Sequence, residues 1–344
     1  MKHIFADLES ACAFVGVVCP PNVSMRLNPT TWVLVPIVGH RYGNTSGRIR
    51  LFPDRAGGVV YNWVTGEKAI WVKHSTRKLT KEEIRQKREE QHALEAKALA
   101  EQMERYQAVA VRATEIYHDI PNLLYAFNHD YWVKKNLSLY LRDTVDLNWD
   151  YRVETIGRIN LRVGFPLKHQ GKRIQGAVVV VPLRDSPCNP NVSSLQFIDD
   201  YGNKTMLAGG KIKGNAWYPF SFKNPSRMHA TLDYATIGIC EGVATAMSIY
   251  KMSGFYTIAA MSCTNLKSVA LKIRKTFPNA RIVIFGDKGN GERDAYLAAQ
   301  AVSGDVKIPS FTRECLVNFM TRTGSNKPTD FNDLMVGLNE DSTD

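Results

Sequence analysis

Between Ala235 and Pro309 the sequence alternates short apolar runs with helix-length segments, and this alternation constrains the fold more than any other feature. The runs ATIGIC, FYTIAAM, RIVIFG and DVKIP read as strands. Helical patterns separate them, near 243–252, near 266–276 and within GDKGNGERDAYLAAQAV. Strands that alternate with helices of about 10–15 residues form parallel sheets with right-handed crossovers. The sequence therefore predicts an α/β fold with a parallel sheet in this region.

Two acidic residues follow strands of this predicted sheet. Glu241 comes directly after ATIGIC, and Asp287 comes directly after RIVIFG. The carboxyl ends of parallel strands meet at one edge of a sheet, where open α/β folds bind their ligands, so we expect both carboxylates in one crevice. A second interpretation stays open for Glu241, because an acid in the first turn also stabilises a helix N-terminus.

The segment PTDFNDLM near the end of the sequence adds Asp330 and Asp333. Carboxylate oxygens suit Mg²⁺, which proteins usually hold with one or two carboxylates plus substrate phosphates. Phosphates bridged by a metal are the basis of phosphoryl and nucleotidyl transfer. The alternative for these two residues is a structural role, capping the start of the last helix.

The formal net charge is +11, and most of the excess lies in residues 156–232, which carry 11 basic and 3 acidic side chains. A basic region beside a candidate acidic site is expected of a protein that binds a polyanion such as nucleic acid. A basic surface that serves only solubility is the alternative. Within this region Lys204, Lys211 and Lys213 surround several glycines, which allow a backbone to approach a phosphate closely.

Residues 1–76 read as a small β-rich module with Gly-rich turns. Its aromatic residues are interleaved with arginines, a mixture that could stack bases and hold phosphates. Half-buried aromatics of an ordinary core are the alternative. The aromatic residues in this mixture are Trp32, Tyr42, Phe52, Tyr61, Trp63 and Trp71, and the interleaved arginines are Arg41, Arg48, Arg50 and Arg55.

Several classes of protein are disfavoured by what the sequence lacks. The six cysteines form no CxxC pair, and no His lies at zinc-finger spacing, which argues against a zinc ribbon or a disulfide framework. No apolar run approaches the roughly 20 residues of a membrane span, and the first residues lack a signal-peptide core. No GxxxxGK[ST] motif occurs, so no Walker-type motor is predicted. We expect a cytoplasmic protein that does not bind membranes.

The acidic motifs together resemble the TOPRIM domain that bacterial-type primases, topoisomerases and some nucleases share. The matching segments are EGVATAMS (241–248), IFGDKGNGERDAYLAA (284–299) and DFND (330–333). The closer resemblance is to primases of plasmids, phages and satellite elements. Their region ahead of TOPRIM reads much like VVVVPLRD, SSLQFID and GNKTMLAGGKIKG, and their opening module looks like RIRLFPDRAGGVVYNWVTGEKAIW.

The resemblance implies a TOPRIM parallel-sheet domain preceded by a basic β-rich (α+β) primase subdomain, with a small N-terminal β-rich module and a long connecting helix. The helix is expected from Thr80 to about Tyr117, where the sequence lacks Gly and Pro and carries mixed charges such as Arg85 and Glu89, so we expect an exposed connector. From about Gly157 strands are expected in LRVGFPL, QGAVVVVPLR and VSSLQFID. The predicted regions are the N-terminal module (1–76), the connector helix (77–119), a small linker region (120–155), the basic subdomain (156–232), the TOPRIM domain (233–312) and a C-terminal tail with DFND (313–344).

By the resemblance, Glu241 would be the catalytic acid of the first motif, and Asp287 the leading aspartate of the metal motif. Both would take part in binding Mg²⁺ or Mn²⁺. Lys204, Lys211 and Lys213 would line the basic face that holds template or incoming nucleotides. Arg184 and Lys288 are further candidates for contact with nucleotide or DNA.

One departure from the family concerns the second motif. That motif usually reads Asp-x-Asp, but here Gly289 occupies the second acidic position. The resemblance therefore implies that one ligand is missing or is supplied by another acid. The candidates for that ligand are Glu292, Asp294, and the pair Asp330 and Asp333.

The resemblance implies a DNA primase that joins ribonucleoside triphosphates into short RNA primers on a single-stranded DNA template. The reaction would be metal-dependent nucleotidyl transfer during replication of a plasmid, phage or mobile element, with a separate replicative helicase as partner. Two alternatives stay open. One is a TOPRIM nuclease that uses water as its nucleophile. The other is a noncatalytic nucleic-acid-binding protein with a degenerate TOPRIM site.

Overall fold

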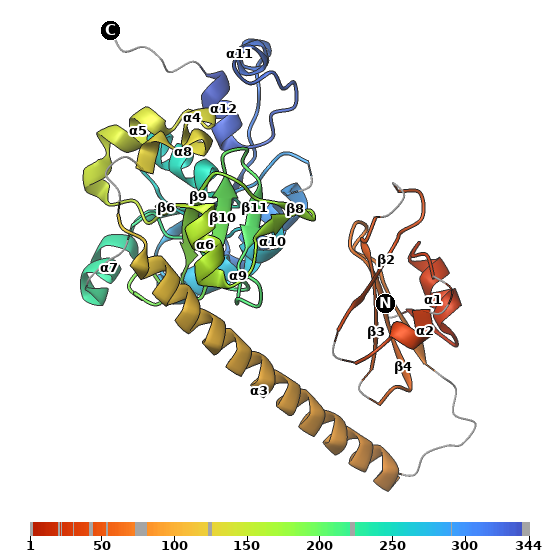
Figure 1. The fold of residues 1–344 in the computed structure, drawn as a ribbon. Coiled ribbons are helices and arrows are strands. Elements are labelled where there is room, and N and C mark those ends of the chain that lie inside the picture. Colours follow the sequence, from red (N-terminus) through yellow and green to blue (C-terminus); the bar gives the residue numbers. More distant parts are fainter. Residues whose placement is uncertain are drawn as a thin grey trace. The chain divides into compact units, whose positions relative to one another are not determined.

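The computed structural model describes residues 3–19, 21, 23–29, 31–40, 44–52, 54–72, 81–122, 126–220, 224–289 and 291–338. The chain divides into two compact units, Met1–Met103 and Glu104–Asp344. Both appear in Figure 1.

The first unit is built on a five-stranded sheet of order β1-β5-β4-β3-β2, in which β1 pairs with β5 in parallel and the other pairs are antiparallel. One face of this sheet packs against α1, where Ala11, Cys12, Val35, Ile49 and Val60 are buried in one core. The expectation of a β-rich segment is confirmed. The elements are β1 (His3–Phe5), α1 (Leu8–Phe14), α2 (Val23–Arg26), β2 (Val33–Val35), β3 (Gly47–Leu51), β4 (Gly57–Asn62) and β5 (Lys68–Val72).

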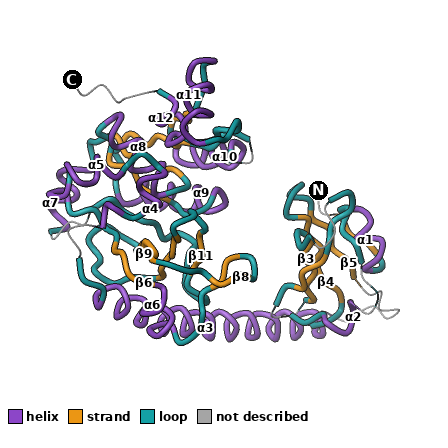
Figure 2. The backbone as a smooth tube through the Cα atoms, turned by 45° about the horizontal axis from the view of Figure 1, so that its top comes forward, coloured by secondary structure: helices purple, strands orange, loops and turns teal. Residues whose placement is uncertain are grey.

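The long helix is α3, Lys81–Asp119, which is unbroken in Figures 1 and 2. Arg85 and Glu89 form an ion pair of 3.8 Å on its exposed surface, as the sequence suggested. The last turns differ from the expected solvated connector. Ala113, Ile116 and Tyr117 are almost wholly buried in a core of the second unit, because they pack against an antiparallel sheet there.

The second unit contains two four-stranded sheets (Figures 1 and 2). The first is antiparallel, with the order β11-β10-β9-β6, and the second is parallel, with the order β13-β12-β14-β15. Single bridges from Ala216 to Arg184 and from Trp217 to Ala259 connect the ends of the two sheets. The elements ahead of the parallel sheet are η1 (Ala126–Asn128), α4 (Asp130–Lys134), α5 (Ser138–Asp143), η2 (Val145–Leu147), β6 (Arg152–Thr155), α6 (Ile156–Val163), β7 (Lys168–His169), β8 (Lys172–Arg173), β9 (Ala177–Leu183), β10 (Ser194–Asp199), β11 (Lys204–Met206) and α7 (Pro225–Leu232).

The parallel sheet confirms the α/β prediction. Its two faces alternate along each strand: Ile237 and Ile282 lie in the core with α9 and α10, whereas Cys240 and Phe285 lie in the core with α8 and α12. The elements of this region are β12 (Thr236–Cys240), α8 (Val243–Ser253), β13 (Tyr256–Ala259), η3 (Cys263–Asn265), α9 (Leu266–Thr276), β14 (Arg281–Phe285), α10 (Glu292–Val302), β15 (Asp305–Lys307), α11 (Arg313–Thr323) and α12 (Phe331–Gly337).

One expected strand is wrong. Residues 161–163 of LRVGFPL belong to the end of helix α6, which Gly164 terminates with a φ of +76°. A left-handed glycine after the last turn is a common helix ending. Residues 120–155 were expected to be a small linker region. Three of them, Trp132, Leu137 and Trp149, are instead buried in the same core as residues of the parallel sheet. The boundaries of the six regions stay predictions.

Candidate active site at the carboxyl edge of the parallel sheet

The two acidic residues that follow strands lie next to each other because of the sheet order. β12 and β14 are hydrogen-bonded parallel neighbours, with Ile239 opposite Ile284. Glu241 and Asp287 therefore leave the sheet at the same edge. Asp330, at the N-terminus of α12, is close enough to raise the pKa of both carboxylates. We call Glu241, Asp287 and Asp330 the acidic edge.

The carboxylate of Asp287 is in an unfavourable environment. Burial, followed by the negative charges of Asp330 and Glu241, raises its pKa from 3.8 to about 7. Its Oδ1 atom is buried and has no hydrogen-bond partner among the described residues. Buried polar atoms in proteins are nearly always hydrogen-bonded, so an orphan carboxylate oxygen calls for an explanation.

Burial also raises the pKa of Glu241, while Lys204 and a hydrogen bond from the Cys263 backbone oppose this rise. Asp294, on the first turn of α10, adds negative charge on the same side. A carboxylate with a raised pKa takes up a proton more readily near neutral pH. Glu241 is thus placed as a group that could move a proton at this edge.

The DFND segment has a largely structural role in this structure. Asp330 and Asp333 form a capping box: Asp330 accepts the Asp333 N–H at 2.9 Å, and Asp333 accepts the Asp330 N–H at 3.4 Å. Asp333 also accepts the Thr329 N–H at 2.9 Å. Asp333 also lies 3.7 Å from the ammonium of Lys135. Asn332 is fully buried and donates to the Lys135 carbonyl and to Ser248, which ties α12 to α8. The capping interpretation is confirmed for both acids, and Asp330 additionally belongs to the acidic edge.

The expected alternative ligand Glu292 is used differently. Its Oε1 accepts the N–H of Gly289 at 2.8 Å, which closes the turn after Asp287. Gly289 itself has a φ of +93°, a backbone conformation that side chains with a Cβ rarely adopt. An aspartate, which the usual motif has at this position, would therefore be strained in this loop.

Oxygen donors dominate the acidic edge, and such donors fit Mg²⁺ or Mn²⁺ rather than a softer metal. The orphan oxygen of Asp287 and the repulsion among the carboxylates are what a cation would relieve. Among the described residues, however, no three His, Cys, Asp or Glu side chains form a group that could hold a metal ion as they stand. The donors fit the ion, but they are not arranged around a single point.

Lys204 is the predicted lysine that the structure brings to the acidic edge. It lies at the start of β11 and lowers the pKa of both Glu241 and Asp287. A Cβ placed on Gly242 would be 3.5 Å from its Nζ, so the ammonium lies against the turn that follows β12.

The other predicted basic residues lie in different environments. Burial lowers the pKa of Lys272, and the positive charge of nearby Lys211 lowers it further. Lys213 is exposed. Lys288 extends over the ring of Phe311 at 5.8 Å. The loop that carries Lys211 and Lys213 is held to the parallel sheet by buried Asn265, which donates to the carbonyls of Ile212, Asn215 and Ala260.

Arg184 is not placed to contact a nucleotide or DNA. Only 4% of it is exposed, and its guanidinium donates to both carboxylate oxygens of Asp150 and to the Pro190 carbonyl. The sequence showed a basic residue at the end of a strand, but its acidic partner lies 34 positions away. The structure gives Arg184 a structural role.

A cavity of about 360 Å³ adjoins the acidic edge, and sequence reasoning missed most of it. Lys134, Lys135 and Lys204 line it together with Tyr131 and Tyr201, and we call it the lysine pocket. The Tyr131 hydroxyl is buried without a hydrogen-bond partner among the described residues. The adjacent lysines 134 and 135 could have indicated a phosphate-binding site in the sequence. Acidic residues nearby leave this region without a net positive charge, so the charge count did not reveal it.

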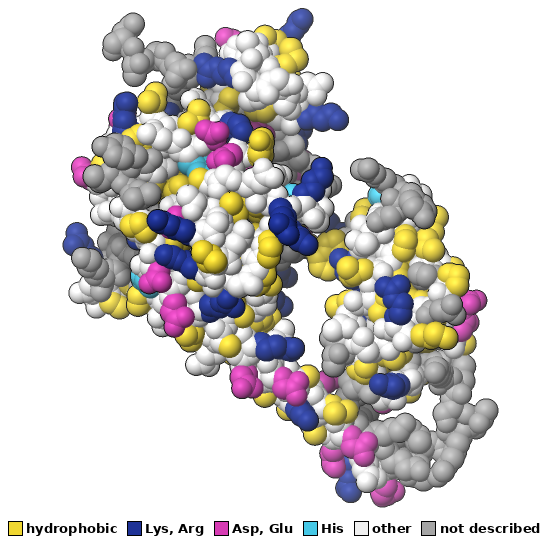
Figure 3. Space-filling view, in the orientation of Figure 1, with side chains coloured by type: hydrophobic (Ala, Val, Ile, Leu, Met, Phe, Trp, Pro, Cys, Tyr) yellow, Lys and Arg dark blue, Asp and Glu magenta, His cyan; other side chains and the backbone are white. Residues whose placement is uncertain are grey.

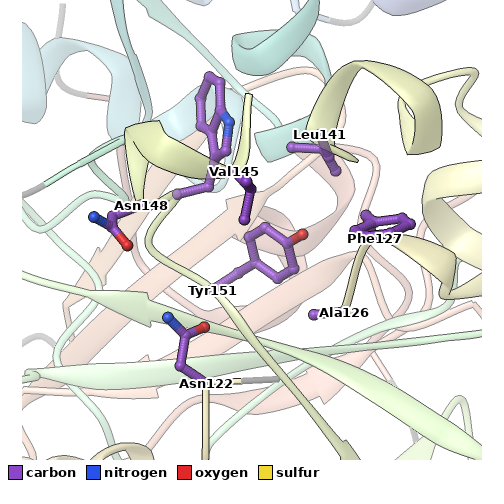
Figure 4. A pocket seen from close by; sticks show the side chains of 8 residues that line it. Asn122, Ala126, Phe127, Leu141, Val145, Asn148 and Tyr151 are labelled. Atoms are coloured by element: carbon purple, nitrogen blue, oxygen red, sulfur yellow. The ribbon is translucent and has the colours of Figure 1, made fainter. Parts of the chain in front are cut away.

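A second cavity, of about 100 Å³, has a different character. In Figure 4 the ring of Tyr151 points between Leu141, Val145 and Phe127. None of the described residues that line it is charged. It is a gap among core aromatics and offers no groups for catalysis.

On the face of the second unit that Figure 3 displays, Lys and Arg side chains gather over the β7–β8 hairpin. Lys168, Lys172 and Arg173 of that hairpin are exposed. The Lys204 carbonyl lies 3.0 Å from the ring of His169, so the hairpin is joined to the strand that carries Lys204. No helix in the part of the chain that the structure describes is long and apolar enough to cross a bilayer.

The curated relatives include two proteins called DNA primase TraC from Escherichia coli, which are 31% and 29% identical to this chain over 128 residues. Each match covers 34% of this chain, and this chain spans only 8% and 12% of the length of those relatives.

Solved structures with some similarity include the RNA polymerase domain of Mycobacterium tuberculosis primase DnaG in complex with double-stranded DNA, with a TM-score of 0.38 and 11% identity over 59% of this chain and 71% of that one. Another is the DnaG primase catalytic domain bound to ssDNA, with a TM-score of 0.37 and 11% identity over 58% and 66% of the two chains.

The family comparison concerns the region that carries the acidic edge. Residues 236–338 match the Toprim domain family. This range begins with β12 and ends just after α12, so it contains Glu241, Asp287 and Asp330. Residues 236–338 of this chain are therefore a Toprim domain, in a chain that shares part of its sequence with DNA primases.

Proposed function

We propose that this chain is a DNA primase that makes short RNA primers on single-stranded DNA by metal-dependent nucleotidyl transfer. The observation that carries the proposal is the position of Lys204 beside the acidic edge of a Toprim domain. The partial similarity to DNA primase TraC supports it. A role in replicating a plasmid, phage or mobile element, with a separate helicase as partner, is part of the same proposal.

Glu241, Asp287 and Asp330 are the residues that would hold Mg²⁺ or Mn²⁺. A bound divalent ion would supply positive charge for the reacting phosphates. The residues of the chain itself would do the rest. Lys204 would hold a phosphate close to the carboxylates, where its charge offsets the negative charge of the transition state. Glu241 would accept the proton of the attacking 3′-hydroxyl.

The lysine pocket is the best place for the incoming ribonucleoside triphosphate. Its lysines suit phosphates, and its tyrosines offer a hydrogen bond and a ring. Lys134 lies 5.0 Å from the Tyr201 ring and donates to the Asp200 carbonyl at 2.6 Å, so part of the pocket is held in place already.

The direct test is to incubate the purified chain with single-stranded DNA, labelled ribonucleotides and Mg²⁺ or Mn²⁺. Short labelled RNA products that depend on template and metal are expected. Template cleavage without nucleotides would instead identify a nuclease. Binding without either product would favour the noncatalytic alternative, which the backbone conformation of Gly289 supports.

Replacing Lys204 by Ala is expected to lower primer synthesis on the order of 10²-fold, because an ammonium aimed at the reacting phosphates is lost. The matched control is Lys213→Ala, which removes the same charge from an exposed position of the same basic region. It should change the rate less than about twofold. Steady-state rates of primer synthesis are measured for both variants. Equal losses of rate would contradict the proposal that Lys204 holds a reacting phosphate.

Substitutions of the two acids of DFND are expected to have different effects, one on stabilisation by Mg²⁺ and the other on the free energy of unfolding. Asp330→Asn keeps a good N-cap but removes a charge from the acidic edge, so Mg²⁺ should stabilise the variant less than the parent. Asp333→Ala removes half of the capping box and the partner of Lys135, and should lower the free energy of unfolding by about 1 kcal/mol. The response of Asp333→Ala to Mg²⁺ should stay normal.

Thermal unfolding with and without Mg²⁺ measures both effects without depending on activity. An unchanged Mg²⁺ response in Asp330→Asn would restrict Asp330 to its capping role.

A further inference from the structure

In the described part of the first unit, helices α1 and α2 contribute to the core on one face of the sheet, and the opposite face carries a different set of side chains. Its strand register places Leu34, Arg48, Tyr61 and Lys68 side by side across β2, β3, β4 and β5. These side chains point away from the core that packs on α1, since residues of the opposite parity fill that core. We call the six residues of this surface that carry charge or a ring the open face. They are Trp32, Arg48, Arg50, Tyr61, Trp63 and Lys68.

Rings and cations alternate closely on the open face. The guanidinium of Arg50 lies 4.8 Å from the ring centre of Trp32, and that of Arg48 lies 5.6 Å from Trp63. Tyr61 and Trp63 meet edge to face at 5.5 Å. Arg48 is also held by the carbonyls of Thr45 and Gly47, so part of its position is fixed in advance.

The rings are accessible rather than buried. Trp32 and Trp63 are 40% and 55% exposed. A hollow of about 240 Å³ lies among Trp32, Arg48, Tyr61, Trp63 and Lys68. Trp71, by contrast, is 3% exposed and belongs to the opposite face. The interpretation as ordinary core aromatics therefore holds for Trp71 and not for these rings. Arg41 and Tyr42 lie outside the described residues.

The charge of the open face has one sign. Its three cations lie on β3 and β5, and the described acids of residues 3–72 occupy other places. Asp7 caps α1 and Glu9 lies on α1, Asp54 lies in the turn between β3 and β4, and Glu67 bonds to Thr65 in the β4–β5 hairpin. The surface is complementary to a polyanion that also has flat apolar groups.

We propose that the open face is a binding site for single-stranded DNA, with bases stacked on Trp32, Tyr61 and Trp63 and phosphates on the three cations. Aromatic rings beside Arg and Lys are the general means by which proteins hold unpaired bases without reading their sequence. Duplex DNA is a poor occupant, because its bases are already stacked on each other. The choice of DNA over RNA rests on the proposed function, whose template is DNA.

The tryptophans make a direct experiment possible. The chain has six, and the four outside the open face (Trp71, Trp132, Trp149 and Trp217) are each at most 6% exposed. Titration of the full chain with a thymidine oligonucleotide should quench the emission of Trp32 and Trp63. In Trp32→Ala the remaining Trp63 reports binding, and in Trp63→Ala Trp32 does. Each titration midpoint should move at least about fivefold to higher oligonucleotide concentration.

The control is Tyr234→Ala, which removes an aromatic side chain that is 83% exposed on the second unit. It should leave the quench and the midpoint unchanged. A second measurement replaces Arg48, Arg50 and Lys68 by Gln, which should lower the log–log salt slope of binding by about 2. Circular dichroism checks that each variant is folded.

Three results would overturn the inference: no quench in the parent, a midpoint that the Trp variants leave unmoved, or equal quenching by duplex. A uridine oligonucleotide that binds more tightly than the thymidine one would overturn the choice of DNA. The test measures binding by fluorescence, so it does not require primer synthesis. Glu241 and Asp287 are unchanged in every variant. A parent that makes no primers but shows the quench would refute the proposed function and support the open face.

Discussion

Replacing Glu241 by Gln is expected to reduce primer synthesis by a factor of roughly 10²–10⁴, the range that general acid–base groups contribute. Gln has nearly the size of Glu, so the turn after β12 should keep its shape. The change removes the carboxylate that we propose takes the proton and helps to hold the metal. The variant should fold at least as well as the parent, because burial and the charge of Asp330 already disfavour the ionised Glu241.

The matched control for this change is Glu292→Gln. It removes the same charge from a residue that stands at the start of α10 and accepts the Gly289 N–H. Gln can still accept that hydrogen bond, so synthesis should remain within a few-fold of the parent. Rates measured with template, ribonucleotides and Mg²⁺ at several pH values compare the two. A folded Glu241→Gln protein with near-normal synthesis would sink the catalytic role of Glu241.

The position of Glu241 and Asp287 at the carboxyl edge of the sheet could be predicted because it depends on local sequence patterns. Each acid directly follows a buried apolar strand, and parallel strands end at a common edge. The order of the strands could not be predicted in the same way. That β12 lies between β13 and β14 depends on pairing between distant segments, and this order is what puts Glu241 beside Asp287.

The basic residues show the limit of sequence reasoning. Lys204, Lys211 and Lys213 look alike in the sequence, since each lies within two positions of a glycine. The pairing of β11 with β10 brings Lys204 to the acidic edge. Arg184 looked equally available, but Asp150 binds it in a buried pair. Which charge meets which partner is decided by tertiary contacts that leave no local pattern.

Residues with amide side chains were missed for a related reason. Asn265 holds the glycine-lysine loop, and Asn332 ties α12 to α8 and to the segment that carries Lys135. An Asn in a loop or at a helix start has an ordinary local explanation in turns and caps. Its role as a buried clamp becomes visible only when its partners, far away in the sequence, are known.

Replacing Asp287 by Asn is expected to raise the metal-free thermal stability at alkaline pH and to abolish most of the stabilisation by Mg²⁺. In the parent, burial and the charges of Asp330 and Glu241 raise the pKa of Asp287 from 3.8 to about 7. The folded protein therefore keeps a proton that the unfolded chain has already lost between these two values. Ionised Asp287 thus costs stability that grows as pH rises through this window and is complete above it.

Asn carries no charge at any pH, so the variant escapes this cost. The difference in unfolding free energy between variant and parent should be near zero at about pH 4 and largest at about pH 8, with an upper limit of roughly 4 kcal/mol. Asp146→Asn, at an exposed position, is the control and should show no such trend. Melting curves in a chelator across this range measure it.

Added Mg²⁺ reverses the comparison and tests the metal assignment with the same instrument. A cation bound at the acidic edge would neutralise the carboxylate repulsion in the parent, and its melting temperature should rise with Mg²⁺ concentration at pH 8. If Asp287 is a ligand, Asp287→Asn lacks that ligand and has less repulsion to relieve, so its melting temperature should barely respond. If both proteins respond to Mg²⁺ alike, the ion binds elsewhere. The orphan oxygen of Asp287 then needs another partner, such as a group of the nucleotide itself.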